Sequence, residues 1–282
     1  MLAVVIGRVR TRPLAAATLA LAGISLIGIL IPMLDIAVSR LFYRPGVGFP
    51  AADNPTLLFL RATGMRISNI AIIALVAAAL WGLFRRPHFA VIRPRVLVFL
   101  ASSMALGPGL LVNTLLKDHW GRARPVQTDL FGGSHPFTLP WVISDGCDRN
   151  CSFVSGEASG SFWFIALAFV VPIAWRRRTA IAALAWTFVM SLNRIAFGGH
   201  YLSDVLIGWA LVLVVILAAR DLVLIRWGEA IDGWFDQLDW QRFDAAVRAL
   251  RGALLDPLLD SLVRRFKAIA TFVRNLGNSH ER

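Results

Sequence analysis

Three short polar clusters lie where apolar stretches of this 282-residue chain meet polar loops. In the last cluster, Arg194 stands six positions before His200, and Asp204 follows four positions after it. On a helix, that spacing places His200 and Asp204 on one face, one turn apart. A carboxylate that holds one imidazole nitrogen fixes the tautomer and leaves the other nitrogen free to act as a nucleophile or base. This cluster therefore predicts nucleophilic chemistry at His200, with Asp204 orienting its ring.

The other two clusters supply groups that suit a phosphate ester. Fixed cations such as Lys117 and Arg124 stabilise the charge that develops on oxygen during phosphoryl transfer. Ser155 and Gly156 begin an apolar stretch, where the free N–H groups of a helix N-terminus would bind an anion. Each residue alone has a plainer explanation, such as a lysine reaching the membrane interface or Glu157 favoured by the helix dipole. Their order and spacing together favour one anion site.

The spacings Lys117-x6-Arg124-Pro125 and Arg194-x5-His200-x3-Asp204 resemble the first and third signatures of the type 2 phosphatidic acid phosphatase superfamily. The resemblance implies a metal-independent enzyme with no cofactor, in which His200 takes the phosphoryl group and Asp204 orients it. It also implies that phosphate is bound by five residues: Lys117, Arg124, Ser155, Gly156 and Arg194.

The middle signature departs from the pattern of that superfamily. The family usually has Pro-Ser-Gly-His, whose histidine protonates the leaving group, where this chain has Val154-Ser155-Gly156-Glu157. A glutamate beside three cations is ionised near neutral pH, and Glu157 would act as the general acid only if burial outweighed those cations.

The run 151–159, Cys-Ser-Phe-Val-Ser-Gly-Glu-Ala-Ser, is similar to a branch that includes lipid A 4'-phosphatases. This resemblance implies hydrolysis of a phosphomonoester on a glycolipid such as lipid A. Undecaprenyl diphosphate and phosphatidylglycerol phosphate are alternative substrates. Transfer of the phosphoryl group to another lipid or sugar is a second alternative, because it uses the same nucleophile. A non-catalytic channel or scaffold would not be expected to keep His200, Asp204 and every cation.

Composition places these clusters in a membrane protein. Hydrophobic residues make up 57% of the chain, charged residues make up 16%, and the mean hydropathy is +0.65. Most of its apolar segments approach the roughly 20 residues that cross a bilayer. The six segments are 14–34, 67–84, 96–116, 158–175, 180–192 and 205–225. We therefore predict an all-α polytopic membrane domain of six transmembrane helices over residues 1–225, with the first segment kept as an anchor and not cleaved as a signal peptide.

Arginines in the short loops predict the orientation of that domain. They cluster at 8–12, 85–95 and 176–178, which the positive-inside rule places in the cytoplasm. The termini would then be cytoplasmic, and the three clusters would face the periplasm or exterior of a bacterial inner membrane. The outer segments 35–66 and 126–154 are rich in Gly and Pro, so we expect loops, with one short helix near 55–61 and a lid formed by 126–154.

The net charge of +12 favours anionic lipid as a partner over nucleic acid, because the arginines flank apolar spans and no nucleic-acid motif is present. Residues 226–282 alternate apolar and basic residues at helical spacing, which predicts a tail of amphipathic helices on anionic lipid. Packing of this tail on the domain's own loops, or on another subunit, is the alternative.

The chain contains two cysteines, Cys147 and Cys151, both in the loop before the second cluster. In an oxidising compartment they would close a small disulfide ring, and free thiols are the alternative. Two thiols without a neighbouring histidine pair make a metal site a poor alternative.

Overall fold

The computed structural model describes residues 12–84 and 93–237, with a few single positions beyond 237. Within these ranges the regular elements are helices, and the only β-structure is two isolated bridges. Five helices of the described part are long and apolar enough to cross a membrane: Pro13–Leu30, Pro55–Ala79, Pro94–His119, Ile173–Ala196 and Leu202–Arg226. The all-α membrane architecture is thus confirmed, but the count of six spans is not.

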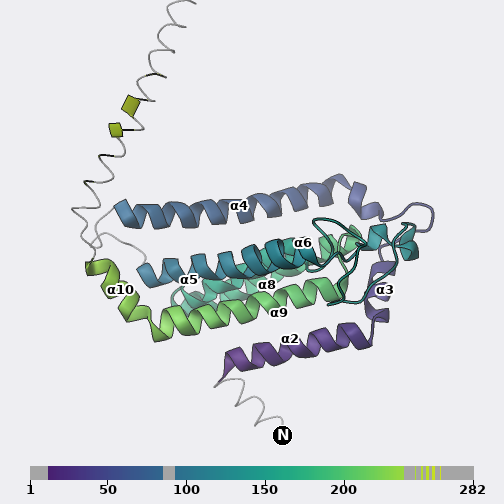
Figure 1. The fold of residues 1–282 in the computed structure, drawn as a ribbon, viewed down its shortest axis with the longest axis horizontal. Helices are drawn as coiled ribbons and strands as arrows, with labels where there is room; N and C mark the ends of the chain where they lie inside the picture. The colour runs from purple at the N-terminus through teal and green to yellow at the C-terminus, as the bar shows by residue number, and fades with distance from the viewer. Residues whose placement is uncertain are drawn as a thin grey trace, which may run out of the picture.

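The long helices run side by side along one direction (Figure 1). They are α2 (Pro13–Leu30), α4 (Pro55–Phe84), α5 (Pro94–Met104), α8 (Ile173–Ala196) and α9 (Leu202–Ala219). Helix α2 packs along α9, while α4 flanks the opposite side of the bundle, over α5. The loop 120–155 gathers at the same end of the bundle as α3 (Met33–Arg40) and α6 (Lys117–His119), whereas α10 (Gly228–Gln237) and the start of α5 lie at the other end.

The segment predicted as the fourth span differs from the expectation. Helix α7 (Gly156–Trp163) passes into a 3₁₀ stretch, η6 (Phe164–Phe169), and the chain then turns. Pro172 explains the turn, because proline disfavours a helical conformation in the residue before it. Helix α8 begins directly after this proline, so the three arginines 176–178 lie within its first turns and not in a loop.

The third span changes its winding midway. Helix α5 continues as a π-helical stretch, η3 (Ala105–Leu116), which contains Pro108. Proline cannot donate to the carbonyl four residues earlier, so the ordinary helical ladder is interrupted there. Asn113 and Thr114 instead donate their side chains to carbonyls five residues before them, at 2.7 Å and 3.2 Å.

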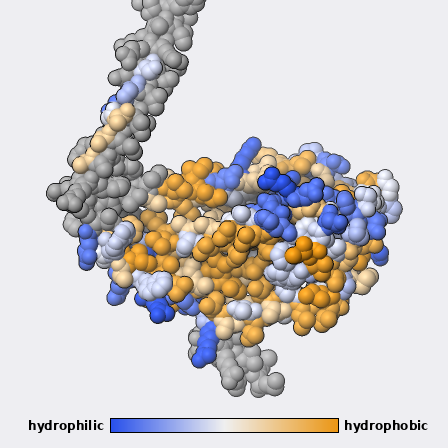
Figure 2. Space-filling model, viewed as in Figure 1, coloured by the Kyte–Doolittle hydropathy of each residue, from blue (hydrophilic) through white to orange (hydrophobic). Residues whose placement is uncertain are grey.

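The core lies around α7 and α9, and large apolar side chains also cover the outside. One buried cluster joins the third span to these two helices and includes Phe99, Val112, Trp163 and Ile207. On the outside, Leu19 is 73% exposed, Ile73 66% and Phe188 60%, and Figure 2 shows broad hydrophobic areas on the visible face. Contiguous exposed apolar surface of this kind is what a protein presents to lipid.

The outer segments contain more structure than the sequence suggested. Residues 35–54, expected to be loop, include most of α3 and a 3₁₀ turn, η1 (Pro50–Asp53). The short helix expected near 55–61 is the first part of α4, so the predicted span beginning at residue 67 started too late. The loop 120–155 contains two short 3₁₀ turns, η4 (Pro125–Gln127) and η5 (Asp129–Phe131), and a disulfide joins Cys147 to Cys151.

The start of the predicted tail packs on the domain itself. Helix α10 contacts α5 and the π-helical end of α9, η7 (Arg220–Arg226). Asp232 on α10 accepts from Arg95 Nε at 2.6 Å and from the Arg95 amide at 3.0 Å. The other amphipathic helices of the tail, and the arginines at 8, 10, 85 and 86, lie outside the described ranges. The division of the chain at residue 225 stays a prediction.

Candidate active site

His200 lies in the turn between two long helices, with its ring buried. Helix α8 ends at Ala196 and α9 begins at Leu202, so His200 belongs to neither. Its Nδ1 is 2.7 Å from the carbonyl oxygen of Ser152. A carbonyl oxygen only accepts, so Nδ1 carries the proton and Nε2 of the neutral ring keeps its lone pair. The contact at Nδ1 therefore leaves the lone pair of Nε2 available to a ligand.

Burial and three cations favour that neutral ring. Burial lowers the pKa of His200 well below 6.5, and the positive charges of Arg194, Lys117 and Arg124 lower it further, against the opposing effect of the Ser152 carbonyl. These three cations come from α8, the end of the third span and the loop after it, so the fold gathers them around one imidazole. Within the described ranges, no group of three or more His, Cys, Asp or Glu residues is placed to hold a metal ion.

The ring of His200 is held by the Ser152 carbonyl and not by Asp204, whose carboxylate binds Arg122, Ser152 and the Tyr201 amide instead of the expected imidazole. The expectation assumed that both residues lie on one helix, but α9 begins only at Leu202. Asp204 instead caps that helix by accepting from the Tyr201 amide at 2.9 Å. It also accepts from Ser152 Oγ at 2.6 Å. Since the Ser152 carbonyl holds His200, Asp204 acts on the imidazole through Ser152.

A buried arginine, Arg122, holds Asp204 in place. Its Nη1 lies 2.5 Å from Asp204 Oδ1, and its Nη2 lies 2.9 Å from Asp35 Oδ2 on α3. Its guanidinium carbon also sits 4.3 Å from the centre of the Tyr201 ring, a cation–π distance. Burial alone would lower the pKa of Arg122, but the two carboxylates outweigh it and raise the pKa above its usual value.

The network around Arg122 was missed in the sequence. Arg122 lies in the same cluster as Lys117 and Arg124, two positions before Arg124. A second arginine so close to Arg124 was the one feature of the sequence that could have indicated a role for Arg122. Asp35 carried no signal, because its partners Arg122 and Ser203 are remote in the chain; it accepts from the Ser203 amide at 2.7 Å. Together these contacts tie α3, the loop and the start of α9 into one support for the His200 turn.

Arg124 is held by the ring that the disulfide closes. Its Nη2 donates to the carbonyl oxygen of Asn150 at 2.6 Å, and Asn150 lies between Cys147 and Cys151. The Asn150 amide donates in turn to Asp118 Oδ1 at 3.1 Å. Burial is the main cause that lowers the pKa of Arg124. The disulfide ring therefore fixes the direction in which this cation points.

Ser155 and Gly156 form the start of α7, as a phosphate-binding turn requires. Ser155 is the N-cap, and its Oγ accepts from the Ala158 amide at 3.4 Å. A Cβ added at Gly156 would lie 2.3 Å from Asn113 Oδ1 and 3.1 Å from Lys117 Nζ. A side chain at this position would therefore displace the Asn113 amide and crowd Lys117, which approaches the N-terminus of α7.

Glu157, which stands where the resembling family has histidine, is paired with two arginines. Arg61 on α4 donates from Nε and Nη2 to Oε1 at 3.1 Å and 3.0 Å, and from Nε to Oε2 at 3.2 Å. Arg194 Nε lies 3.3 Å from Oε1. One carboxylate therefore binds two guanidinium groups, one from α4 and one from α8. Arg61 lies outside the three polar clusters of the sequence, so no motif indicated this contact.

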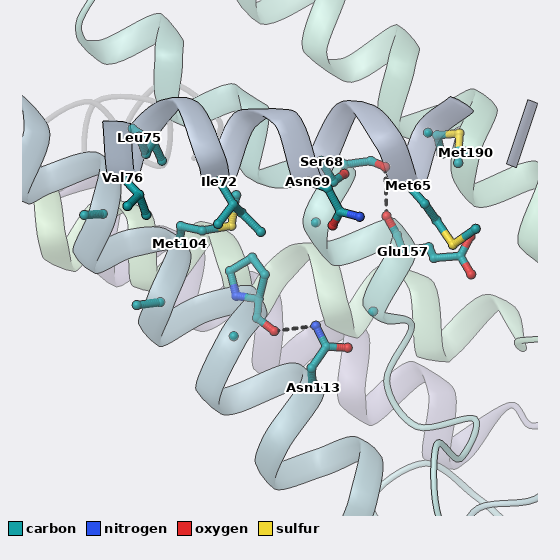
Figure 3. Close-up of a pocket in the computed structure, with 18 of the residues that line it drawn as sticks. Met65, Ser68, Asn69, Ile72, Leu75, Val76, Met104, Asn113, Glu157 and Met190 are labelled. Carbon is teal, nitrogen blue, oxygen red and sulfur yellow. Dashed lines mark hydrogen bonds between the residues drawn. The ribbon is translucent and has the colours of Figure 1, made fainter. Parts of the chain in front are cut away.

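A cavity of about 760 Å³ opens beside these residues, between α4, the third span and α7. Most of its lining is apolar, and three residues of the candidate anion site also line it: Lys117, Gly156 and Glu157. Figure 3 shows Glu157 and Met65 toward one end of the cavity and Leu75 and Val76 toward the other. The anion site and the apolar cavity are thus continuous.

Comparison with known proteins finds relatives of this chain among lipid phosphatases. The model of the PAP2 superfamily matches residues 95–227. A lipid A 4'-phosphatase of Rhizobium leguminosarum is 39% identical over 204 residues, which cover 66% of this chain and 86% of the relative. A lipid A 4'-phosphatase of Francisella tularensis subsp. novicida is 44% identical over 114 residues, covering 39% of this chain and 50% of the relative. A crystal structure of a transmembrane PAP2 type phosphatidylglycerolphosphate phosphatase from Bacillus subtilis aligns with a TM-score of 0.47 and 16% identity, covering 75% of this chain and 96% of that one.

Proposed function

We propose that this chain, which belongs to the lipid A 4'-phosphatase-like branch of the PAP2 superfamily and is a membrane lipid phosphatase, hydrolyses a phosphomonoester of a glycolipid such as lipid A. The reaction would pass through a phosphohistidine on His200. One observation carries the proposal. A neutral imidazole, with Nε2 free, stands among three cations beside the mouth of an apolar cavity.

The proposed reaction has two steps. His200 Nε2 attacks phosphorus, the bond from phosphorus to the lipid oxygen breaks, and the leaving oxygen takes a proton. Water then attacks the phosphohistidine, releases inorganic phosphate and restores the neutral ring. Lys117, Arg124 and Arg194 would stabilise the charge on the equatorial oxygens in both steps. The Ser152 carbonyl would stabilise the imidazolium form by accepting from Nδ1.

The cavity supports a lipid substrate over a soluble phosphate ester. Its apolar walls come from α4 and the third span, such as Ile72, Leu75 and Met104, and they lead directly to Lys117. An acyl chain in this space would place the headgroup phosphate at the end that carries the cations. A soluble phosphate ester would leave this apolar surface without an occupant, which is unfavourable in water.

Basic residues support an outward-facing site in a bacterial inner membrane. Arg95 lies in the first turn of α5 and the arginines 176–178 lie in the first turns of α8, and both helices start at the end of the bundle opposite the loop 120–155 (Figure 1). By the positive-inside rule, the arginine end faces the cytoplasm. The His200 turn would then face the periplasm, where a disulfide such as Cys147–Cys151 persists.

The test is incubation of the purified, detergent-solubilised protein with a panel of phosphorylated lipids, with free phosphate and lipid mass followed together. The panel contains lipid A, undecaprenyl diphosphate and phosphatidylglycerol phosphate. We expect phosphate release and loss of one phosphate in mass from lipid A, abolished in His200→Ala. Release from another lipid only would contradict the glycolipid substrate, and a gain of mass on a second lipid without free phosphate would show a phosphotransferase.

A further inference from the structure

Arg61 has no assigned role in phosphate chemistry, yet it stands at the junction of the cavity and the cation cluster. It lies on α4, three and four positions before Gly64 and Met65, so these side chains share a face of the helix. Gly64 and Met65 line the cavity. The Arg61 side chain is 33% exposed, which leaves it reachable by a molecule that enters from the cavity or from the water phase.

Its partner is an anion that belongs to the protein. Arg61 donates to the Glu157 carboxylate from two nitrogens. Nη2 lies 3.0 Å from Oε1, and Nε lies 3.1 Å from Oε1 and 3.2 Å from Oε2. A guanidinium group binds a phosphate with the same forked geometry that it uses for a carboxylate. The guanidinium group of Arg61 therefore holds the Glu157 carboxylate in the geometry that it would use for a phosphate.

Arg194 makes an incomplete contact with the same carboxylate. Its Nε lies 3.3 Å from Glu157 Oε1, close enough for an ion pair. The hydrogen-bond geometry is not met, however, and this buried Nε is left without a hydrogen-bond partner. The Arg194 side chain is 3% exposed, and a buried unsatisfied donor of this kind is costly. An incoming anion could satisfy it where the carboxylate does not.

We infer that Arg61 is a substrate-binding residue, and that the substrate phosphate displaces the Glu157 carboxylate from Arg61 and Arg194 when it binds. This inference rests on the proposed function and adds a fourth cation to its site. Glu157 acts as an exchangeable counter-ion. Its carboxylate neutralises the guanidinium groups of the empty site, and the substrate phosphate, which has more oxygens, replaces it there. A phosphate can bond to Arg61 and Arg194 together, and it also meets Lys117, which approaches the N-terminus of α7 next to Glu157.

The exchange also gives Glu157 a route to proton donation. Once displaced, the carboxylate no longer binds Arg61 and Arg194 and lies beside the bound phosphate, where it can carry a proton taken from water. That proton passes to the leaving oxygen when the bond from phosphorus to oxygen breaks. A resting carboxylate paired with two arginines and a proton donor in the occupied site are then two states of one residue.

The experiment measures inhibition by orthovanadate, a phosphate analogue, together with steady-state kinetics on the lipid that the wild type hydrolyses. Arg61→Gln should raise the inhibition constant and KM by roughly tenfold to a hundredfold, the effect of losing a charge-assisted bond to an anion. Glu157→Gln should lower the inhibition constant, because the competing charge is gone, while kcat drops. Arg66→Gln is the matched control, since Arg66 is an exposed arginine on the same helix.

The opposite signs separate binding from a structural role. If the ion pair only stabilised the fold, Arg61→Gln and Glu157→Gln would shift the inhibition constant in the same direction, or leave it within twofold of the Arg66→Gln value. Either result would overturn the inference. If Arg61→Gln does not fold, Arg61→Lys keeps the charge but loses the fork, and it should still weaken vanadate several-fold; no weakening would also overturn it. A wild-type protein that neither releases phosphate nor responds to vanadate would instead refute the proposed function.

Discussion

Replacing Arg122 with methionine should lower the free energy of unfolding by about 3–5 kcal/mol, the cost of removing one partner from a buried ion pair. The side chain is fully buried and lies against Asp35 and Asp204, which are almost as inaccessible. It also donates from Nε to the Thr138 carbonyl at 2.9 Å and from Nη1 to Ser203 Oγ at 2.9 Å. Methionine fills much of the volume but leaves both carboxylates without a cation.

The assay is thermal unfolding of the full chain in detergent, where this loss corresponds to a fall in Tm on the order of 10 °C. Adding Asp35→Asn to Arg122→Met should recover part of the loss, because one uncompensated carboxylate is removed. Arg66→Gln serves as the control for loss of an arginine charge. A Tm for Arg122→Met that equals the control would refute the reasoning that this buried network supports the His200 turn.

Three further results are expected. Burial and three cations lower the pKa of His200 well below 6.5. For that reason kcat/KM should stay level as the pH falls from about 7.5 to about 6.5 and decrease only at lower pH. A decline of kcat/KM centred near the ordinary imidazole pKa of about 6.5 would contradict this. The unfolded chain takes up a proton at this histidine below about pH 6.5 while the folded chain does not, so the stability that depends on His200 is complete above that pH and is lost as the pH falls further, as denaturant titrations across pH can measure. Cys147→Ser should raise KM roughly two- to tenfold with a smaller change in kcat, because Arg124 loses its fixed contact to Asn150; a reductant should reproduce the effect on the wild type, and an unchanged KM in both would contradict it.

The sequence predicted the parts of this protein that local pattern controls. Apolar runs located most of the long helices, and the order of Lys117, Arg124, Arg194 and His200 identified cations that the fold gathers around one ring. The fourth span could not be bounded in this way, because apolar composition continues through Pro172 while the backbone turns there.

The parts that were not predicted depend on contacts between remote segments. The spacing of four between His200 and Asp204 suggested a helical pair, but the helix begins between them and the carboxylate turns to Arg122. Asp35 reaches the site from α3 and Arg61 reaches it from α4, each across a separation that no short pattern encodes. Ser152 binds His200 through its main-chain carbonyl, which every residue type has. The residue type at position 152 therefore could not predict this contact.

The most direct test of the account is to trap the covalent intermediate. The purified protein is mixed with lipid A that carries radiolabelled phosphate for a fraction of a turnover, denatured in alkali, and digested for mass spectrometry. We expect an acid-labile, alkali-stable phosphoryl group on the peptide that contains His200, and none in His200→Ala. Rapid release of phosphate with no label at this position, or a label on another residue, would contradict His200 as the nucleophile.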